Sequence, residues 1–152
     1  MKTKILRTAG LAILTALCLH SCCQRGNCGR FTAHENTLIH ETDSIMRMLT
    51  IENPSDEAVL RAKSSNLSAE ALLSDEYEKL SELMIATVTH PSQDGVGIAG
   101  PQVGLNRRVV AVQRFDKEGE PFEVYPNVRI VWQSDSLAFG PEGCLSVPDR
   151  RE

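Results

Sequence analysis

The chain has 152 residues, of which 41% are hydrophobic and 24% charged, and its formal net charge is −4 at pH 7. This length allows one ordinary domain whose core needs no disulfide bridges. Only 5% of the residues are aromatic and the basic residues are scattered, so the composition argues against a protein that binds nucleic acid.

The N-terminal residues have the pattern of an export signal. Basic residues precede an uncharged apolar run at residues 9–19, which is shorter than the roughly 20 residues that a membrane-spanning helix needs. The following LHSC, ending at Cys22, resembles the bacterial lipobox, in which the cysteine is lipidated. We expect a signal peptide at residues 1–21 and an exported lipoprotein that is anchored in the membrane through Cys22. Without a functional signal, the protein would be cytoplasmic.

Two alternatives stay open for this N-terminal part. The apolar run would also suit a helix packed on the domain, although it lacks the polar alternation of a half-buried helix. Cys22, Cys23 and Cys28 would suit a zinc site, but they lack the two-residue spacing with which paired sulfurs commonly hold one ion.

Residues 22–50 are predicted to be a polar tether that leads into a short helix, because apolar residues recur only weakly there. His34 and His40 are spaced so that they would not share a helix face, and we expect both to be solvated. The domain itself is predicted over residues 51–152.

Two helices are predicted at the start of this domain. In the stretch IENPSDEAVLRAKS, Asp56 and Glu57 would lie in a first helical turn. From Asp75 to about Thr89, apolar residues recur at helical spacing, and Asp75 with Glu78 is predicted to cap this helix. The apolar stripe is expected to face the core.

After Pro91 and Gly95 the pattern changes to that of strands. Residues 107–115 are predicted to form one strand, DKEGE a turn, and residues 121–135 one or two further strands. Helices followed by antiparallel hairpins indicate an α+β fold.

The loop DGVGIAGPQVG is rich in glycine. It contains the letters of a dinucleotide-binding loop, but it follows a helix where that motif follows a strand. Glycine also allows close approach of a backbone, and Gln102 would then offer its amide to a charged oxygen. An ordinary tight loop is the alternative.

The stretch GPEGCLSVP contains the single cysteine of the predicted domain, Cys144. Its thiolate would suit a metal ligand, or a nucleophile with His90 as the base. A buried, inert thiol is the alternative.

Together, the two loops resemble the motifs of the peptide deformylase family. GVGIAGPQ, from Gly95 to Gln102, is similar to the first motif, and EGCLS, from Glu142 to Ser146, matches the second at every position. The resemblance implies the N-terminal part of a peptide-deformylase-like domain, which hydrolyses the formyl group of N-formylmethionyl peptides.

The resemblance also implies roles for individual residues. Cys144 would be one ligand of Fe2+ or another divalent metal, Zn2+ or Ni2+, which polarises the formyl carbonyl and lowers the pKa of a bound water. Gln102 and the backbone N–H of Leu145 would bind the developing oxyanion. The remaining implied substrate-site residues are Val96 and Gly97, which would line the peptide groove, and Glu142 and Arg151, which would buttress the site as a pair.

The sequence departs from the family pattern in three respects. Gly100 replaces a usual alanine and is expected to loosen its loop, and Asn127 follows Pro126 where an asparagine commonly precedes it, which puts the strand geometry in doubt. The third motif, H-E-x-x-H, supplies two metal ligands and the general base in the family, and it is absent from these residues. The chain is therefore expected to be a fragment that lacks the metal-binding helix and has no appreciable activity alone.

Two functions of different classes follow from these observations. The first is a peptide deformylase, a metallohydrolase that would act in N-terminal methionine processing. The alternative is an exported lipoprotein that uses the deformylase scaffold as a non-catalytic peptide-binding module. A thiol hydrolase with Cys144 and His90 is the least favoured.

Overall fold

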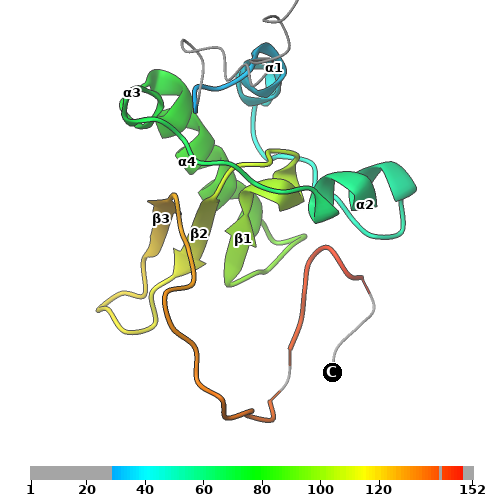
Figure 1. The fold of residues 1–152 in the computed structure, drawn as a ribbon, viewed down its shortest axis with the longest axis vertical. Helices are drawn as coiled ribbons and strands as arrows, with labels where there is room; N and C mark the ends of the chain where they lie inside the picture. Colours follow the sequence, from blue (N-terminus) through cyan, green and yellow to red (C-terminus); the bar gives the residue numbers. More distant parts are fainter. Residues whose placement is uncertain (1–28, 141, 149–152) are drawn as a thin grey trace, which may run out of the picture.

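The computed structural model describes residues 29–140 and 142–148. The expected signal peptide, the lipidation site Cys22 and the cysteines considered for zinc therefore lie outside the described residues, as does Arg151. In the described part, helices come first and a three-stranded antiparallel sheet follows (Figure 1), which confirms the predicted α+β class. None of the helices described is long and apolar enough to cross a membrane.

Most helices begin after a residue whose side chain caps their first turn. The bounds are α1 (Ala33–Glu41), α2 (Pro54–Arg61), α3 (Ala69–Leu72) and α4 (Asp75–Val88). Asn53 and Ser68 accept backbone N–H groups at the starts of α2 and α3. Asp56 and Glu57 lie in the first turn of α2, as predicted.

The predicted cap of α4 is wrong. The N-cap residue is Ser74, it makes no side-chain capping bond, and Asp75 is already the first helical residue. The reason is that the Ser74 hydroxyl donates to the carbonyl of Ala71, 2.9 Å away, and so closes the turn after α3. The predicted apolar stripe is confirmed, because its members are buried in the core: Leu80, Leu83, Met84 and Val88.

The sheet has the order β1-β2-β3, and α4 packs against it (Figure 1). Its strands are β1 (Gly97–Ala99), β2 (Val109–Gln113) and β3 (Phe122–Pro126), with the 3-10 helix η1 (Gly100–Val103) between β1 and β2. Pro126 pairs with Val109 in β3, so the strand runs on to the proline despite the departure from the family pattern. Asn127 follows in a left-handed conformation, with φ at 56°.

The core begins earlier in the chain than the expected domain start at residue 51. Phe31, Ile39 and Met46 are buried in the same cluster as α4 and the sheet. The helix expected in this segment is α1. A buried ion pair between Glu35 of α1 and Arg107, just before β2, joins this helix to the rest of the domain. Residues 31–49 are therefore part of the packed domain, because their apolar side chains and one carboxylate are covered by it.

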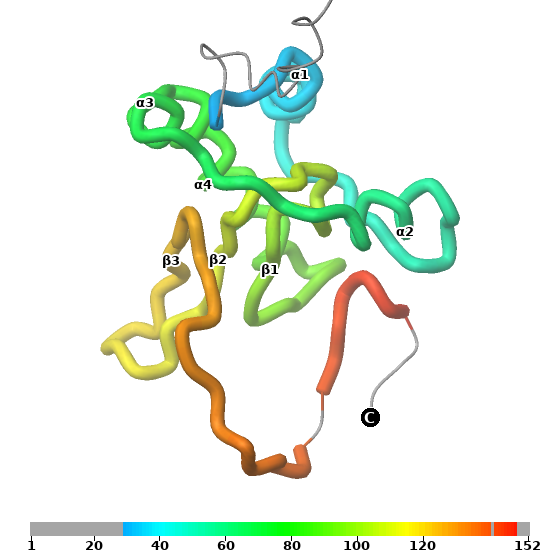
Figure 2. The backbone as a smooth tube through the Cα atoms, viewed as in Figure 1, coloured from blue at the N-terminus to red at the C-terminus, as the bar shows by residue number. Residues whose placement is uncertain are grey.

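Beyond β3 the chain runs away from the sheet and returns beside α2 and β1 (Figure 2). Residues 127–140 form no further strand, and many of their large apolar side chains are exposed: Ile130, Val131, Trp132, Leu137 and Phe139. The returning part contains the cysteine loop, so the topology brings the two sequence motifs to the same side of the sheet.

Candidate functional site

The glycine loop runs through β1 and η1. A Cβ atom on Gly100 would lie 2.8 Å from the carbonyl oxygens of both Leu105 and Arg107. Only glycine allows such an approach without movement of the backbone. The expectation that Gly100 loosens the loop is therefore wrong: it allows a close contact, and the N–H of Leu105 donates to the Gly100 carbonyl at 2.9 Å.

Gln102 is held at both ends of its side-chain amide. Its Oε1 accepts the N–H of Ala99 at 2.9 Å, and its Nε2 donates to the Oγ of Ser146 at 3.2 Å. Its backbone carbonyl also accepts the N–H of Leu49 at 2.8 Å. Gln102 thus links the glycine loop to the cysteine loop, which an ordinary loop glutamine would not do.

The outer edge of β1 lies beside this amide. The N–H of Gln113 donates to the carbonyl of Val96, which makes these residues a hydrogen-bonded pair. Pairs alternate in an antiparallel ladder, so at Gly97 and Ala99 the backbone polar groups point away from β2. The N–H of Ala99 is the one that Gln102 receives, and Gly97 therefore directs its N–H and C=O along the same edge.

The cysteine loop is exposed except at Leu145, Ser146 and Val147. A turn is closed by the N–H of Val147, which donates to the Cys144 carbonyl at 2.9 Å. Ser146 is buried, and its carbonyl accepts the N–H of Ile51 at 3.0 Å. The Leu145 side chain packs on the core next to Gly95. Cys144 itself is a free, exposed thiol, which excludes the alternative of a buried inert one.

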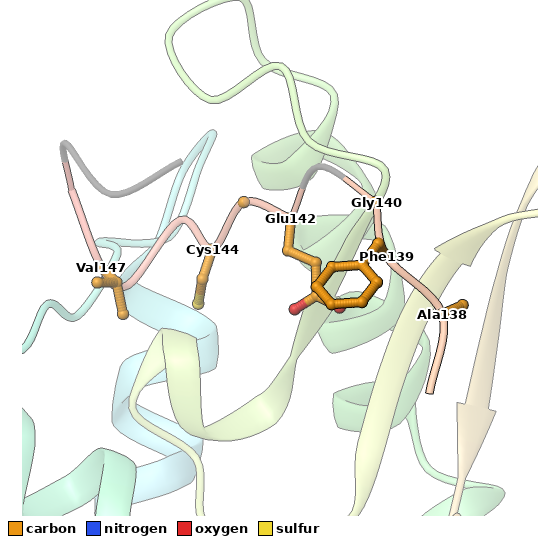
Figure 3. A pocket seen from close by; sticks show the side chains of 7 residues that line it. Ala138, Phe139, Gly140, Glu142, Cys144 and Val147 are labelled. Atoms are coloured by element: carbon orange, nitrogen blue, oxygen red, sulfur yellow. The ribbon is translucent and has the colours of Figure 1, made fainter. Parts of the chain in front are cut away.

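Both loops line one cavity of about 650 Å³. Six of the predicted site residues are part of its wall: Val96, Gly97, Gln102, Glu142, Cys144 and Leu145. A second cavity, of about 490 Å³, adjoins it at the cysteine loop and includes Phe139. Figure 3 shows the side chains of Glu142, Cys144 and Val147 directed to the same side of this segment. The predicted pair of Glu142 with Arg151 involves a residue outside the described range.

The histidine considered as a base is placed elsewhere. His90 is exposed, its Nδ1 lies 2.8 Å from the Oγ of Ser92, and it is not part of either cavity wall that contains Cys144. Nothing in this geometry supports a thiol hydrolase. His34 and His40 are exposed, as predicted.

The described residues provide only part of a metal site. Cys144 brings one sulfur to the cavity, and Glu142 lies near it. Within residues 29–140 and 142–148, no three side chains of His, Cys, Asp or Glu are grouped so that they could hold a metal. Three protein ligands are typical of a catalytic site, so the described residues do not form one by themselves.

Two parts of the site had no role predicted from their residues, Ser146 and residues 49–51. Ser146 belongs to the matched motif EGCLS, and this position in the motif is the sequence signal that could have marked it as a site residue. Residues 49–51 contact both loops through backbone N–H groups. Backbone donors leave no mark on residue type, so no sequence signal would have identified this segment.

Comparison with known proteins gives a consistent result. Residues 37–152 match the sequence profile of the family described as Polypeptide deformylase. The chain is 42% identical over 94 residues to peptide deformylase 2 of Gloeobacter violaceus, covering 60% of this chain and 47% of that protein. It is 35% identical to a peptide deformylase of a Caulobacter species, covering 70% of this chain and 59% of that protein. The chain thus spans about half the length of the curated relatives it matches.

Solved structures are similar as well. The Met-Ala-Ser-bound class I type b peptide deformylase from Acinetobacter baumannii has a TM-score of 0.59 and 30% identity, covering 73% of this chain and 70% of that one. A peptide deformylase from Synechococcus elongatus in complex with actinonin has a TM-score of 0.57 and 28% identity, covering 70% of this chain and 53% of that one.

Proposed function

This chain belongs to the polypeptide deformylase family, and from that premise we propose that it provides the peptide-binding edge, the oxyanion donors and one metal ligand of a peptide deformylase. The proposed reaction is hydrolysis of the formyl group at the N-formylmethionine of a peptide, with release of formate. One observation carries the proposal: both motifs meet at one cavity, whose wall includes Gln102 and Cys144. The matched relatives are named as deformylases, which supports the enzyme over a non-catalytic module.

The peptide is proposed to bind as an extended strand along the outer edge of β1. Backbone groups of Gly97 point to this edge, and the side chain of Val96 beside them is 60% exposed. An extended peptide can pair with such an edge through its main chain, which gives affinity with little dependence on sequence. The Met-Ala-Ser-bound relative supports a peptide ligand.

The formyl oxygen is proposed to lie between the Gln102 amide and the backbone N–H of Leu145. Both residues line the cavity, and both belong to loops that are held by hydrogen bonds or core packing. Donors that are already oriented stabilise a developing negative charge without reorganisation. This is the part of the chemistry that the chain's own residues perform.

Cys144 is proposed to be one ligand of a divalent metal, Fe2+, Zn2+ or Ni2+. Its sulfur is exposed and lies in the cavity wall, and thiolates suit such ions. Because the described residues do not complete a metal site, we further propose that the 152 residues alone bind substrate without appreciable turnover. Metal bound in substoichiometric amount, and reduced in Cys144→Ser, is the expected result of metal analysis.

The test uses formyl-Met-Ala-Ser and Met-Ala-Ser as probes for calorimetric titration of the chain. We expect tighter binding of the formylated peptide, and loss of that preference in Gln102→Ala while Met-Ala-Ser still binds. The control is Gln133→Ala, an exposed glutamine outside the cavity, which should change neither affinity. Absence of formyl-peptide binding would contradict the proposed function, and rapid formate release by the 152 residues would contradict the proposal on turnover.

We also propose, from the sequence, that Cys22 is lipidated and that the protein is exported and membrane-anchored. Labelled palmitate should be incorporated in a bacterial host, and the label should be lost in Cys22→Ala. Cys23→Ala is the matched control and should keep the label, because only the cysteine at the lipobox position is modified. A label that survives in Cys22→Ala would contradict this assignment.

A further inference from the structure

The orientation of the Gln102 amide follows from its surroundings. The N–H of Ala99 can only donate, so the atom of the Gln102 amide that faces it at 2.9 Å has to be the oxygen. The NH2 group therefore faces the hydroxyl of Ser146, 3.2 Å away. This hydroxyl can accept as well as donate, so it can receive one of the two N–H groups.

Ser146 is the buried residue among those described in the cysteine loop. It is 4% exposed, whereas Leu145 and Val147 beside it are half-buried and Cys144 and Pro148 are exposed. A buried hydroxyl is costly unless it is hydrogen-bonded. Its hydroxyl is hydrogen-bonded to the side chain of Gln102, from which it is separated by 44 positions in the sequence.

The backbone fixes the separation of these two residues. One segment donates to both, through Leu49 to the Gln102 carbonyl at 2.8 Å and through Ile51 to the Ser146 carbonyl at 3.0 Å. The backbones of Gln102 and Ser146 are therefore both hydrogen-bonded to residues 49–51. Neither loop can shift along the other without breaking one of these bonds.

The same segment is itself held in place. The N–H of Met46 donates to the buried hydroxyl of Thr87 in α4 at 2.8 Å. The two carboxylate oxygens of Asp56 accept hydrogen bonds from Nη1 and Nη2 of Arg47, both at 2.8 Å. Oδ2 of Asp56 also accepts the backbone N–H of Thr50 at 3.4 Å. The support for the Gln102 and Ser146 pair thus reaches back to the core helix.

We propose that Ser146 is a positioning residue for Gln102: its hydroxyl accepts one N–H of the amide and thereby directs the other N–H into the cavity beside Cys144. The inference rests on the proposed function for its effect on catalysis, but the orientation itself does not depend on activity. An amide nitrogen is planar, so fixing one N–H fixes the direction of the second. Ser146 does not touch the substrate in this arrangement and acts only through Gln102.

The first test is independent of activity. In the full chain with labelled glutamine, the two Nε2–H resonances of Gln102 are assigned by their loss in Gln102→Ala. We expect them to be dispersed in the wild type, to move toward the values of a solvated amide in Ser146→Ala, and to be restored in Ser146→Thr, which keeps a hydroxyl. Urea unfolding establishes whether each variant is folded. If Ser146→Ala is not folded, Ser146→Gly is used as the variant without a hydroxyl. Unchanged resonances in the folded Ser146→Ala or Ser146→Gly variant would overturn the inference.

The second test separates positioning from a general structural role. Formate release is measured on the whole encoded protein with added divalent metal. We expect Ser146→Ala to lower kcat about 10-fold, a part of the 100-fold or greater loss that deleting an oxyanion donor causes, with KM unchanged within about twofold. In a Gln102→Ala background the same change should have no further effect. An equal loss in both backgrounds would overturn the positioning role. Absence of turnover in the unmutated whole encoded protein would contradict the proposed deformylase activity alone, because the resonance test decides the orientation.

Discussion

The two loops that meet at the cavity are held in different ways. The glycine loop is part of the sheet, with Ile98 and Val103 buried and Gly100 in close contact with the backbone that follows it. The cysteine loop lies at the end of a long exposed segment and is attached mainly through Leu145 and Ser146. The first loop is positioned by the fold itself, and the second is docked onto it.

Because of this difference, substitutions at the two loops should affect stability differently. Changes beneath the glycine loop should alter the stability of the whole domain, because the loop shares its contacts with the core. Changes at the cysteine loop should open the site locally and leave the domain folded. The following predictions test this contrast, from the largest expected effect on stability to the smallest.

The largest effect is expected at the buried ion pair beneath the glycine loop. Arg107 donates from Nε and Nη2 to the two carboxylate oxygens of Glu35 at 2.6 and 2.7 Å, and its carbonyl lies against Gly100. Arg107→Met should lower the free energy of unfolding by about 3–5 kcal/mol, because it leaves a buried carboxylate without its partner. Urea unfolding measures this change.

The matched control is Arg61→Met, which removes an exposed ion pair with Glu57 within one helix. A change below about 1 kcal/mol is expected there. Similar losses in the two variants would contradict the view that the buried pair is part of the scaffold of the site.

A smaller loss is expected from a single methyl group in the glycine loop. Gly100→Ala should cost about 1–3 kcal/mol, because its Cβ would meet two carbonyl oxygens at 2.8 Å and the backbone would have to move. Gly97→Ala is the control, since its Cβ would lie 3.5 Å from the Ala111 carbonyl, an ordinary contact. Thermal or urea unfolding that ranks the two variants equally would contradict the close approach at Gly100.

The same buried carboxylate should make stability depend on pH. Burial by itself raises the pKa of Glu35, but hydrogen bonds from Arg107 and Thr32 and the charge of Arg107 bring it below its ordinary value of 4.5. A pKa lowered by folding contributes stability above pH 4.5 that is lost as the pH falls toward the folded-state value.

In Glu35→Gln this component should be absent, although the variant is less stable at neutral pH. Urea unfolding at several pH values between neutral and about 3 measures the difference between the two proteins. Parallel curves for wild type and Glu35→Gln would show that Glu35 does not have the lowered pKa.

The smallest global effect is expected at the cysteine loop. Leu145→Ala removes the side chain that packs beside Gly95 and should lower the free energy of unfolding by less than about 1 kcal/mol, because the contact is peripheral. Amide exchange of residues 144–147 should nevertheless rise about tenfold, since local opening becomes easier. Leu137→Ala, at a side chain that is 95% exposed, should change neither quantity.

Much of the fold was predictable because it depends on local patterns. The apolar stripe of α4 and the β-branched run of β2 identify their elements through the spacing of buried residues. The cap of α4 was not predictable, because Ser74 bonds backward to the turn after α3. The inclusion of residues 31–49 in the core was not predictable from their apolar pattern. Few apolar residues are needed to hold this segment, because the carboxylate of Glu35 also pairs with Arg107.

The chemistry of the site could be read from residue type alone. The two motifs contain a thiolate, an amide and the glycines that surround them, and residue type decides what an atom can donate, accept or bind. The arrangement of these groups depends on how the chain folds. Gln102 and Cys144 share a cavity because the chain returns to β1 after residue 140, and the direction of the Gln102 amide depends on Ala99 and Ser146. Hydrogen bonds between backbone groups, such as those from Leu49 and Ile51, hold this arrangement, and every residue type carries them alike.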